Sequence, residues 1–409
     1  MANPAHLGIQ RAKARIAARI DVWAFGRQGR RRFRADARYD LRNVTNGFRS
    51  QIQEGVDDTP LLERICAAYN HAMEAQKTAP GDYEWSTNLR GLREASLKPF
   101  IRALTDVDTP ALGQMLRNFY RDPCSSGLLA APHGMSKAYF GPRIRDIYSH
   151  YYLSHVLSRF EYWKELTGSR FSLKDLAGPG VGNPFGVVID GTHIGVGAEY
   201  SHYCAHRVID LLGSLRTKVP VVAEIGGGFG AIAYYLLRDH GPITYVGLDC
   251  PERIALSSFY LLKAFPKHRF LLFGEKAVSA ESIREPGVIL LPAFAVREIP
   301  QHAVDLTFSS LGFGAMSAEH MSECFAEINR ITRTSLLIID NQVPSDHLAR
   351  LIDEEQGSFR LRETLSTAWH SRGKAGAGRK NGAGSASSEL VEQCFSKVRG
   401  DSYKAKTII

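Results

Sequence analysis

The hydrophobic positions in the second half of the chain form short apolar runs separated by amphipathic stretches. The runs predict strands, and the stretches between them, with apolar residues every three to four positions, predict helices. This alternation is typical of βαβ units around a parallel sheet. The predicted strands are Val221–Ile225, Ile243–Asp249, Val288–Leu291, Val304–Ser309 and Ser335–Asp340, and the predicted helices are Phe229–Asp239, Pro251–Phe265 and Ser317–Arg330.

The pattern before this region is different. Residues 50–168 carry helical periodicity interrupted by prolines, and a further helix is predicted from Ala198 to Leu215. We therefore expect a basic N-terminal arm at residues 1–49, a helical cap region at 50–168 and an α/β domain at 169–409.

The C-terminal part carries weaker patterns. Phe359–Ser366 is strand-like, Glu389–Val398 helix-like and Ser402–Ile409 strand-like. Residues 373–388 are rich in Gly, Ala, Ser and Lys, which predicts a mobile loop. A strand, a long loop and a final strand would suit an antiparallel edge of the sheet.

Composition and charge narrow the class of protein. The apolar fraction of 44% and the charged fraction of 23% are those of a globular protein, and no run has the length of a membrane span. The six cysteines form no C-x-x-C pair, and the first residues show no secretory signal, so we expect reduced thiols and a cytoplasmic protein.

The net charge of +9 belongs to the first 50 residues, which hold twelve Arg or Lys against three Asp. Such a cluster favours a peripheral contact with an anionic membrane surface, although a solvated extension is the simpler interpretation. Nucleic acid is a less favoured partner, because interleaved aromatics and a recognisable binding fold are missing. The oligomeric state is not predicted.

The segment with the most specific chemistry is Glu224-Ile225-Gly226-Gly227-Gly228-Phe229-Gly230, between a predicted strand and a predicted helix. Glycines at such a bend allow a ligand to approach the backbone at a helix N-terminus. Asp249, at the end of the next strand, is in the position of an acid that accepts hydrogen bonds from ribose hydroxyls.

Two cofactor classes fit this turn. Gly226-x-Gly228-x-x-Ala231 also satisfies a dinucleotide pattern, which alone is weak. Glu224 would face the pyrophosphate of a dinucleotide, and like charges there are unfavourable. S-adenosylmethionine carries an ammonium and a sulfonium and no phosphate, so the acid favours this cofactor. A plain strand–helix turn is the third interpretation.

Residues from about 182 to 341 resemble the sugar O-methyltransferase family, a branch of the class I methyltransferases. The resemblance rests on Gly182-Asn183-Pro184, on Glu224–Gly230, on Tyr245–Glu252, and on Asp305-Leu306 with Met316. It implies a doubly wound, mostly parallel, Rossmann-like sheet of seven strands, and transfer of a methyl group to a sugar hydroxyl. The chain departs from the family at residues 309–315, where polar residues are mostly missing, and this puts the acceptor in doubt.

The resemblance also implies a cofactor site at the carboxyl ends of strands one to four. The expected cofactor-binding residues are Glu224, Gly226, Gly227, Gly228, Gly230, Asp249, Cys250, Ala293, Phe294 and Ser309. Ala293 and Phe294, after the third strand, are expected to contact adenine.

Transfer to an alcohol benefits from a general base. The candidates are His193, in a predicted turn, and His202 and His206, which are four positions apart and share one helical face. The pair could also ligate a metal, but no third ligand at suitable spacing is evident, and no metal site is predicted.

The sequence thus predicts an S-adenosylmethionine-dependent methyltransferase that methylates a sugar-like hydroxyl of a glycan, glycolipid or glycosylated metabolite. N-methylation of an amino sugar, a NAD(P)-dependent oxidoreductase and a non-catalytic scaffold with the same fold remain alternatives.

Overall fold

A computed structural model describes residues 20, 22–52, 56–79, 97–125, 146–215, 217–342, 350–352, 358–369 and 389–398. The chain forms two compact units. Unit 1 comprises residues 1–52, 131–203 and 368–388, and unit 2 comprises residues 53–130, 204–367 and 389–409. The described residues 56–79 and 97–125 belong to unit 2, which also contains the main sheet.

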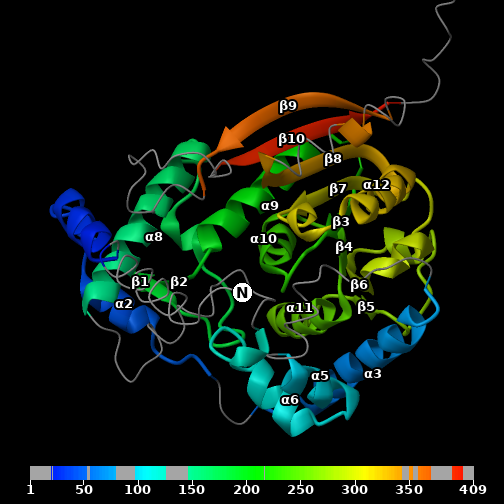
Figure 1. The fold of residues 1–409 in the computed structure, drawn as a ribbon, viewed down its shortest axis with the longest axis horizontal. Coiled ribbons are helices and arrows are strands. Elements are labelled where there is room, and N and C mark those ends of the chain that lie inside the picture. Colours follow the sequence, from blue (N-terminus) through cyan, green and yellow to red (C-terminus); the bar gives the residue numbers. More distant parts are fainter. Residues whose placement is uncertain are drawn as a thin grey trace, which may run out of the picture. The chain divides into compact units, whose positions relative to one another are not determined.

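Unit 2 is built around one sheet of eight strands, in the order β5-β6-β4-β3-β7-β8-β10-β9 (Figure 1). The strands are β3 (Val221–Ile225), β4 (Thr244–Asp249), β5 (Phe270–Leu272), β6 (Gly287–Pro292), β7 (Val304–Ser310), β8 (Thr332–Asn341), β9 (Phe359–Thr367) and β10 (Leu390–Lys397).

The sheet is mostly parallel, which confirms the predicted α/β fold class. The pairs from β5 through β8 are all parallel, and β10 is antiparallel to both β8 and β9. The expected count of seven is not exact, because the short strand β5 adds an eighth at the edge next to β6. The antiparallel end of the sheet is present, as expected from the C-terminal pattern.

Residues 390–397 form this antiparallel strand, so the helix predicted at Glu389–Val398 is wrong. β10 lies between β8 and β9, and its first six residues are buried. Pairing on both sides satisfies the backbone of the whole segment, and this tertiary context outweighs its local helical pattern. The strand predicted at Ser402–Ile409 and the loop at 373–388 lie outside the described residues.

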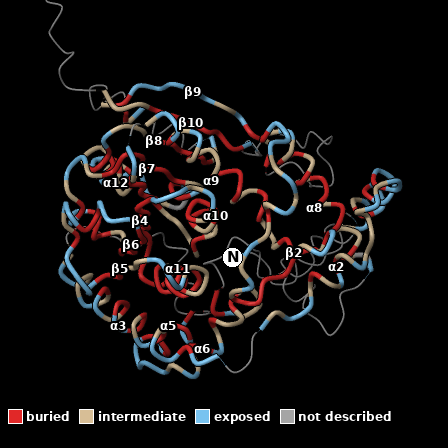
Figure 2. Tube along the Cα trace, turned by 180° about the vertical axis from the view of Figure 1, so that it is seen from behind, coloured by how far each residue is buried: buried red, intermediate tan, exposed pale blue. Residues whose placement is uncertain are grey.

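The helices that connect the strands follow the predicted alternation. They are α10 (Ala231–Asp239), α11 (Pro251–Ala264) and α12 (Ala318–Ile331), together with the short 3-10 helices η3 (Ser282–Arg284), η4 (Ala293–Glu298) and η5 (Phe313–Ala315). Pro251 stands at the first position of α11, and the Ser317 side chain caps α12 by accepting from the His320 amide. β3, β4 and β6 are buried along their whole length (Figure 2).

A helical segment packs onto the same unit. It consists of α3 (Thr59–Gln76), α5 (Lys98–Thr105), α6 (Thr109–Leu116) and η1 (Pro123–Ser125), and α3 lies against α11. Asp58, only 5% exposed, bonds Lys263 at 2.7 Å and Arg117 at 3.2 Å. This ion cluster, in which Asp58 is buried and both cations are partly exposed, joins the start of α3 to α11 and to the end of α6.

Unit 1 contains α2 (Leu41–Gly47), α8 (Asp146–Leu166), η2 (Leu173–Leu176), the hairpin β1 (Gly186–Ile189) and β2 (Thr192–Gly195), and the start of α9 (Ala198–Leu212). Asp190 and Gly191 form the tight turn of the hairpin, both with positive φ. A helix over residues 20–32 is also described, apart from residue 21.

Two further observations bear on expectations from the sequence. None of the described helices has the length and hydropathy needed to cross a bilayer. All six cysteines lie in described segments, and each is a free thiol.

Candidate functional site

The order of the strands places a crevice at the end of β3. From β3 the chain proceeds to β4 and β6 on one side, whereas β7 and β8 lie on the other side. In open parallel sheets, ligands bind outside the carboxyl ends of the strands where the order reverses in this way. The glycine turn predicted from the sequence follows β3 at this reversal point.

The turn has a backbone that requires glycine. Gly226, Gly228 and Gly230 all have positive φ, in the region that side chains disfavour. At Gly227 space is tight instead, because a Cβ there would lie 3.0 Å from the Tyr245 hydroxyl and 3.1 Å from Glu224 Oε2. The turn therefore lies directly on the side chains of β3 and β4.

Three amides of this turn already have partners within the protein. Gly228 N donates to Asp249 Oδ2 at 2.8 Å, Gly226 N to the Leu248 carbonyl at 2.8 Å, and Gly230 N to the Gly227 carbonyl at 3.1 Å. A pyrophosphate cradle needs free amides that point at the ligand. These three amides are therefore not free to bind a phosphate.

Asp249, at the end of β4, keeps part of its accepting capacity. Its carboxylate accepts from the amides of Gly228 and Cys250, and Arg253 Nη1 lies 3.4 Å from Oδ1. A carboxylate offers about four lone-pair sites, so further donors such as hydroxyl groups can still bind there. Asp249 is itself only 1% exposed, and residues 226–229 above it are partly exposed.

Glu224 lies under the turn and is 1% exposed. Its Oε2 accepts a hydrogen bond of 2.5 Å from the Tyr245 hydroxyl. Burial raises the pKa of Glu224 to about 8, the hydrogen bond from Tyr245 opposes the rise, and the negative charge of Asp249 adds to it. The sequence indicates an acid here but not its charge: without a cation nearby, Glu224 is mostly protonated at neutral pH.

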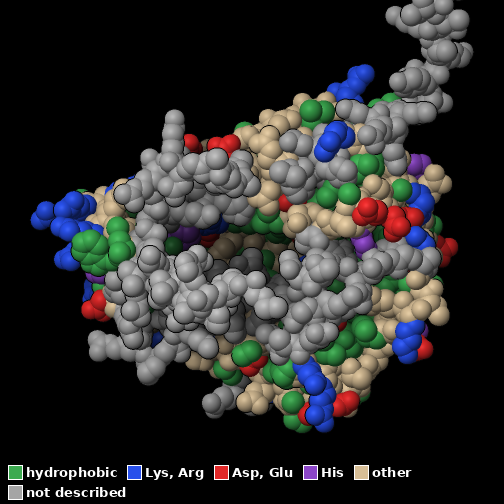
Figure 3. Space-filling view, viewed as in Figure 1, with side chains coloured by type: hydrophobic (Ala, Val, Ile, Leu, Met, Phe, Trp, Pro, Cys, Tyr) green, Lys and Arg blue, Asp and Glu red, His purple; other side chains and the backbone are tan. Residues whose placement is uncertain are grey.

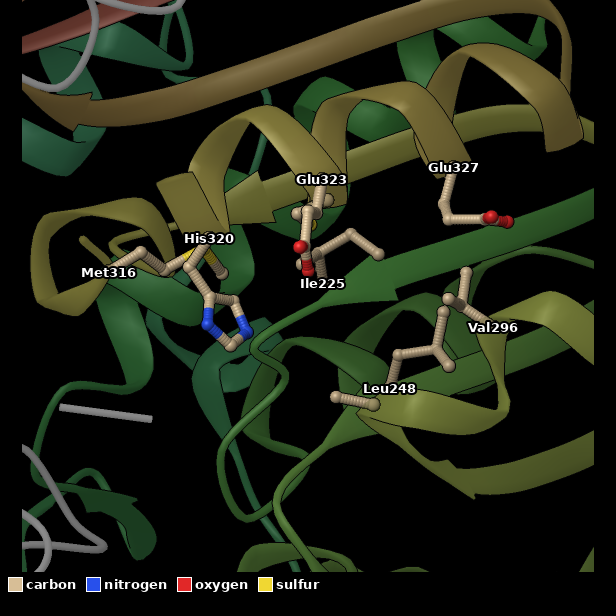
Figure 4. Close-up of a pocket in the computed structure, with 9 residues that line it drawn as sticks. Ile225, Leu248, Val296, Met316, His320, Glu323 and Glu327 are labelled. Atoms are coloured by element: carbon tan, nitrogen blue, oxygen red, sulfur yellow. The ribbon is translucent and has the colours of Figure 1, made fainter. Parts of the chain in front are cut away.

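A small pocket lies at the same edge of the sheet (Figure 4). Its cavity volume is about 30 Å³, and Ile225, Leu248 and Ala293 contribute apolar side chains to it. His320, Glu323 and Glu327 on α12 line its other side. Phe294, which follows Ala293, packs edge-on against Phe273 in the core cluster.

The segment after β7 is fixed to the same edge. The Ser309 hydroxyl donates to the Ile225 carbonyl at 2.8 Å. Asp340, fully buried at the end of β8, accepts from the amides of Phe313 and Gly314 at 3.0 and 3.2 Å, and burial raises its pKa. The predicted strand ending at Asp340 was the only sequence signal for this contact.

The three candidate bases have different hydrogen-bond partners. In unit 1, His193 Nε2 lies 3.2 Å from the Gly47 carbonyl oxygen, and the fully buried His202 accepts from Trp163 Nε1 at 3.3 Å. In unit 2, His206 Nε2 lies 3.1 Å from Asp239 Oδ2, a carboxylate partner that the sequence did not reveal.

The position of His206 is informative, because Asp239 ends α10, whereas the glycine turn begins it. Nine residues of helix separate the two points by about 12 Å along the axis. His206 therefore lies at the far end of α10 from the turn. His320, which the sequence interpretation overlooked, is an imidazole that lines the pocket at the carboxyl edge itself.

Comparisons with known proteins give the following. No family model matches the chain, and no curated protein matches it. Solved structures with similarity include a geranyl diphosphate methyltransferase in complex with S-adenosylmethionine, with a TM-score of 0.34, 10% identity, and 48% of this chain and 85% of that chain covered.

Magnesium protoporphyrin IX methyltransferase from Synechocystis, with bound S-adenosylhomocysteine, has a TM-score of 0.32 and 9% identity, and 58% of this chain and 94% of that chain are covered. Precorrin-6y methyltransferase from Geobacter metallireducens has a TM-score of 0.30 and 14% identity, with 46% and 87% covered. Similarities of this size do not determine an activity, so the functional argument rests on the residues of the chain itself.

Proposed function

We propose that the chain is an S-adenosylmethionine-dependent methyltransferase. The observation that carries the proposal is the pair of buried carboxylates, Glu224 and Asp249, at a glycine turn whose amides at 226, 228 and 230 are used internally. Two acids at a turn with three of its amides bound internally favour a cationic, phosphate-free ligand over a dinucleotide.

The residues present fit this cofactor, which supplies an activated methyl group on a sulfonium when bound. Asp249 would accept hydrogen bonds from the ribose hydroxyls with its remaining lone pairs. Glu224, under Gly227, would interact with the cationic end of the ligand, and Ala293 would contact the adenine ring by apolar packing.

The finer proposal is that the acceptor is a sugar-like hydroxyl. It is supported by the resemblance of residues 182–341 to sugar O-methyltransferases. Methyl transfer depends mainly on positioning, and an alcohol also benefits from a base that removes its proton. His320, with Glu323 one turn later on α12, lines the pocket beside the ends of β3 and β4, so we propose His320 for this role.

The test uses methyl-labelled S-adenosylmethionine with fractionated glycans, lipids and small metabolites, followed by identification of the labelled product. We expect label in a glycan or glycolipid fraction, abolished by Asp249→Asn. The control Asp106→Asn, at an exposed ion pair on the surface of unit 2, should retain full transfer.

The variant His320→Gln separates the finer claim from the general one. It should lower turnover while leaving the affinity for S-adenosylhomocysteine unchanged, because the imidazole is proposed to act on the acceptor. Label in no fraction, with the cofactor bound normally, would favour the scaffold alternative. Label on an amine would favour N-methylation.

We also propose that the N-terminal arm contacts an anionic membrane surface. In the helix over residues 20–32, Ile20 is 58% and Trp23 52% exposed, and Arg27 stacks on Trp23 at 5.3 Å. Arg30, Arg31 and Arg34 follow in the sequence and are exposed. Figure 3 shows Lys and Arg side chains beside hydrophobic ones at the left of the molecule. Exposed apolar groups among cations are typical of helices that bind the surface of a bilayer.

Vesicles of phosphatidylserine and phosphatidylcholine provide the test of this contact. Binding should depend on phosphatidylserine and weaken when Trp23 is replaced by Ala. Binding to single-stranded RNA, with no binding to the vesicles, would contradict the proposal.

A further inference from the structure

A second and larger pocket lies in unit 2 at the amino-terminal ends of the strands, whereas the glycine turn lies at their carboxyl ends. Its cavity volume is about 390 Å³, which is within the range of small-molecule sites. It is formed by the segment before β3, by η3, by the segment before β7 and by the start of β8. All of these belong to unit 2.

The rim of this pocket is basic. Lys218, Arg284 and Arg333 line it together with His302, and Asp305 is the acid among the lining residues. Asp305 is 2% exposed and already committed, because it accepts from the Val221 amide at 3.0 Å and forms an ion pair with Arg333.

Two of the cations are available for a ligand. In the part of the chain that the structure describes, the side chains of Lys218 and Arg284 have no hydrogen bond or ion pair, and both residues are exposed. Arg presents a planar fork that binds two oxygens of a phosphate, and Lys adds a point charge. Together they provide complementary groups for a dianion.

The floor of the pocket is apolar. Val221 is 4% exposed and Ile283 1%, and Pro300 and Ala303 complete the lining at the start of β7. A floor of this kind supports a ring or a short hydrocarbon body beside the charged group of a ligand. The pocket therefore combines an apolar surface with cations at one side.

This pocket is separate from the proposed cofactor site. Val221 begins β3 and Ile225 ends it, so the length of the strand, about 13 Å, lies between the pocket and the glycine turn. Ligands could occupy both places at the same time.

We propose that the pocket at the amino-terminal edge of the sheet binds a phosphate monoester with an apolar or aromatic body. The phosphate is bound by Arg284 and Lys218, and the body rests on Val221, Ile283 and Ala303. The site is independent of methyl transfer, so its test does not depend on the proposed function.

Phenyl phosphate is the probe, with inorganic phosphate and phenol as its separate halves. Binding is measured by calorimetry and ligand-observed NMR, with and without saturating S-adenosylhomocysteine. We expect phenyl phosphate to bind with a Kd of about 1 mM or lower, at least fivefold more tightly than either half, with no competition from S-adenosylhomocysteine.

The double variant Lys218→Gln/Arg284→Gln keeps the side-chain bulk and removes both free cations. It should weaken the binding of phenyl phosphate by about tenfold or more, because two charge-assisted contacts are lost. The control Lys267→Gln/Lys276→Gln removes the same charge from exposed positions outside the pocket and should leave the Kd within about twofold.

Three results would overturn the proposal. Equal weakening in both double variants would mean attraction by net charge only. Inorganic phosphate that binds as tightly as phenyl phosphate would remove the role of the apolar floor. No binding of phenyl phosphate at 10 mM, about ten times the expected Kd, would remove the site itself.

Discussion

Glu224→Gln tests whether the buried acid under the glycine turn gains a negative charge when the cofactor binds. The groups near it are the Tyr245 hydroxyl, the Asp249 carboxylate and the backbone of Gly227. Its pKa is raised to about 8 by burial, so at neutral pH the empty site holds a protonated acid. A bound ammonium would favour the ionised form, and the proton would leave as the ligand enters.

The size of the effect follows from Coulomb's law. A cation about 4 Å from the carboxylate, at an effective dielectric of about 20, stabilises the charge by about 4 kcal/mol, or roughly three pKa units. The pKa of Glu224 would then fall from about 8 to roughly 5 in the complex. Linkage predicts that affinity rises about 20-fold between pH 6 and 7.5, with close to one proton released per ligand near neutral pH.

Calorimetry with S-adenosylhomocysteine in buffers of different ionisation enthalpy measures both quantities. In Glu224→Gln the affinity should be lower by about tenfold or more at pH 7.5 and almost independent of pH. The control Glu281→Gln, at an exposed position, should behave as the wild type. A wild-type affinity that is flat over this range, or the same pH dependence in Glu224→Gln, would refute the reasoning.

The remaining predictions concern stability. Asp58→Asn should destabilise unit 2 by about 2 kcal/mol in chemical denaturation, because two partly exposed cations lose charge-assisted hydrogen bonds to a buried carboxylate, whereas the exposed Asp57→Asn should have little effect. Gly312→Ala should lower the free energy of unfolding by about 1–3 kcal/mol, because its Cβ would lie 2.4 Å from a hydroxyl oxygen and 2.7 Å from a carbonyl oxygen. Gly241→Ala, where a Cβ would meet open space, is the matched control. Partial burial raises the pKa of Asp239, but hydrogen bonds from a His and an Arg lower it to about 2. The ionised carboxylate therefore stabilises the fold above the unfolded pKa of 3.8, and this stabilisation should be lost as the pH falls toward 2. The gap in unfolding free energy between wild type and Asp239→Asn should therefore close over that range, and a constant gap would contradict this account.

The strand–turn–helix segment around residues 221–239 was predictable because local signals and the fold agree there. The apolar run, the glycines and the amphipathic helix each specify the same structure, and all are local in sequence. Asp249 followed from the same logic, as an acid at the end of the next strand. The apolar runs also predicted that these two strands are buried, and β3 and β4 are buried along their whole length.

Contacts between distant segments were not predictable. The helix expected at residues 389–398 is the strand β10, because pairing with β8 and β9 decides its conformation. The bond from Gly228 to Asp249 and the ion cluster at Asp58 join residues far apart in sequence, and no local pattern indicates them.

The charge state of Glu224 also could not be predicted from the sequence. A glutamate in a sequence is assumed to be ionised, but full burial beside a second carboxylate raises its pKa to about 8. A cationic cofactor is therefore favoured because Glu224 loses its proton when the ligand binds. The empty site does not carry a permanent negative charge at Glu224.

Direct titration of the protein with S-adenosylhomocysteine and, separately, with NAD and NADP tests the central claim most directly. The account predicts saturable, one-to-one binding of S-adenosylhomocysteine that is lost in Asp249→Asn, and no binding of either dinucleotide. Tight binding of NAD or NADP, with none of S-adenosylhomocysteine, would contradict it.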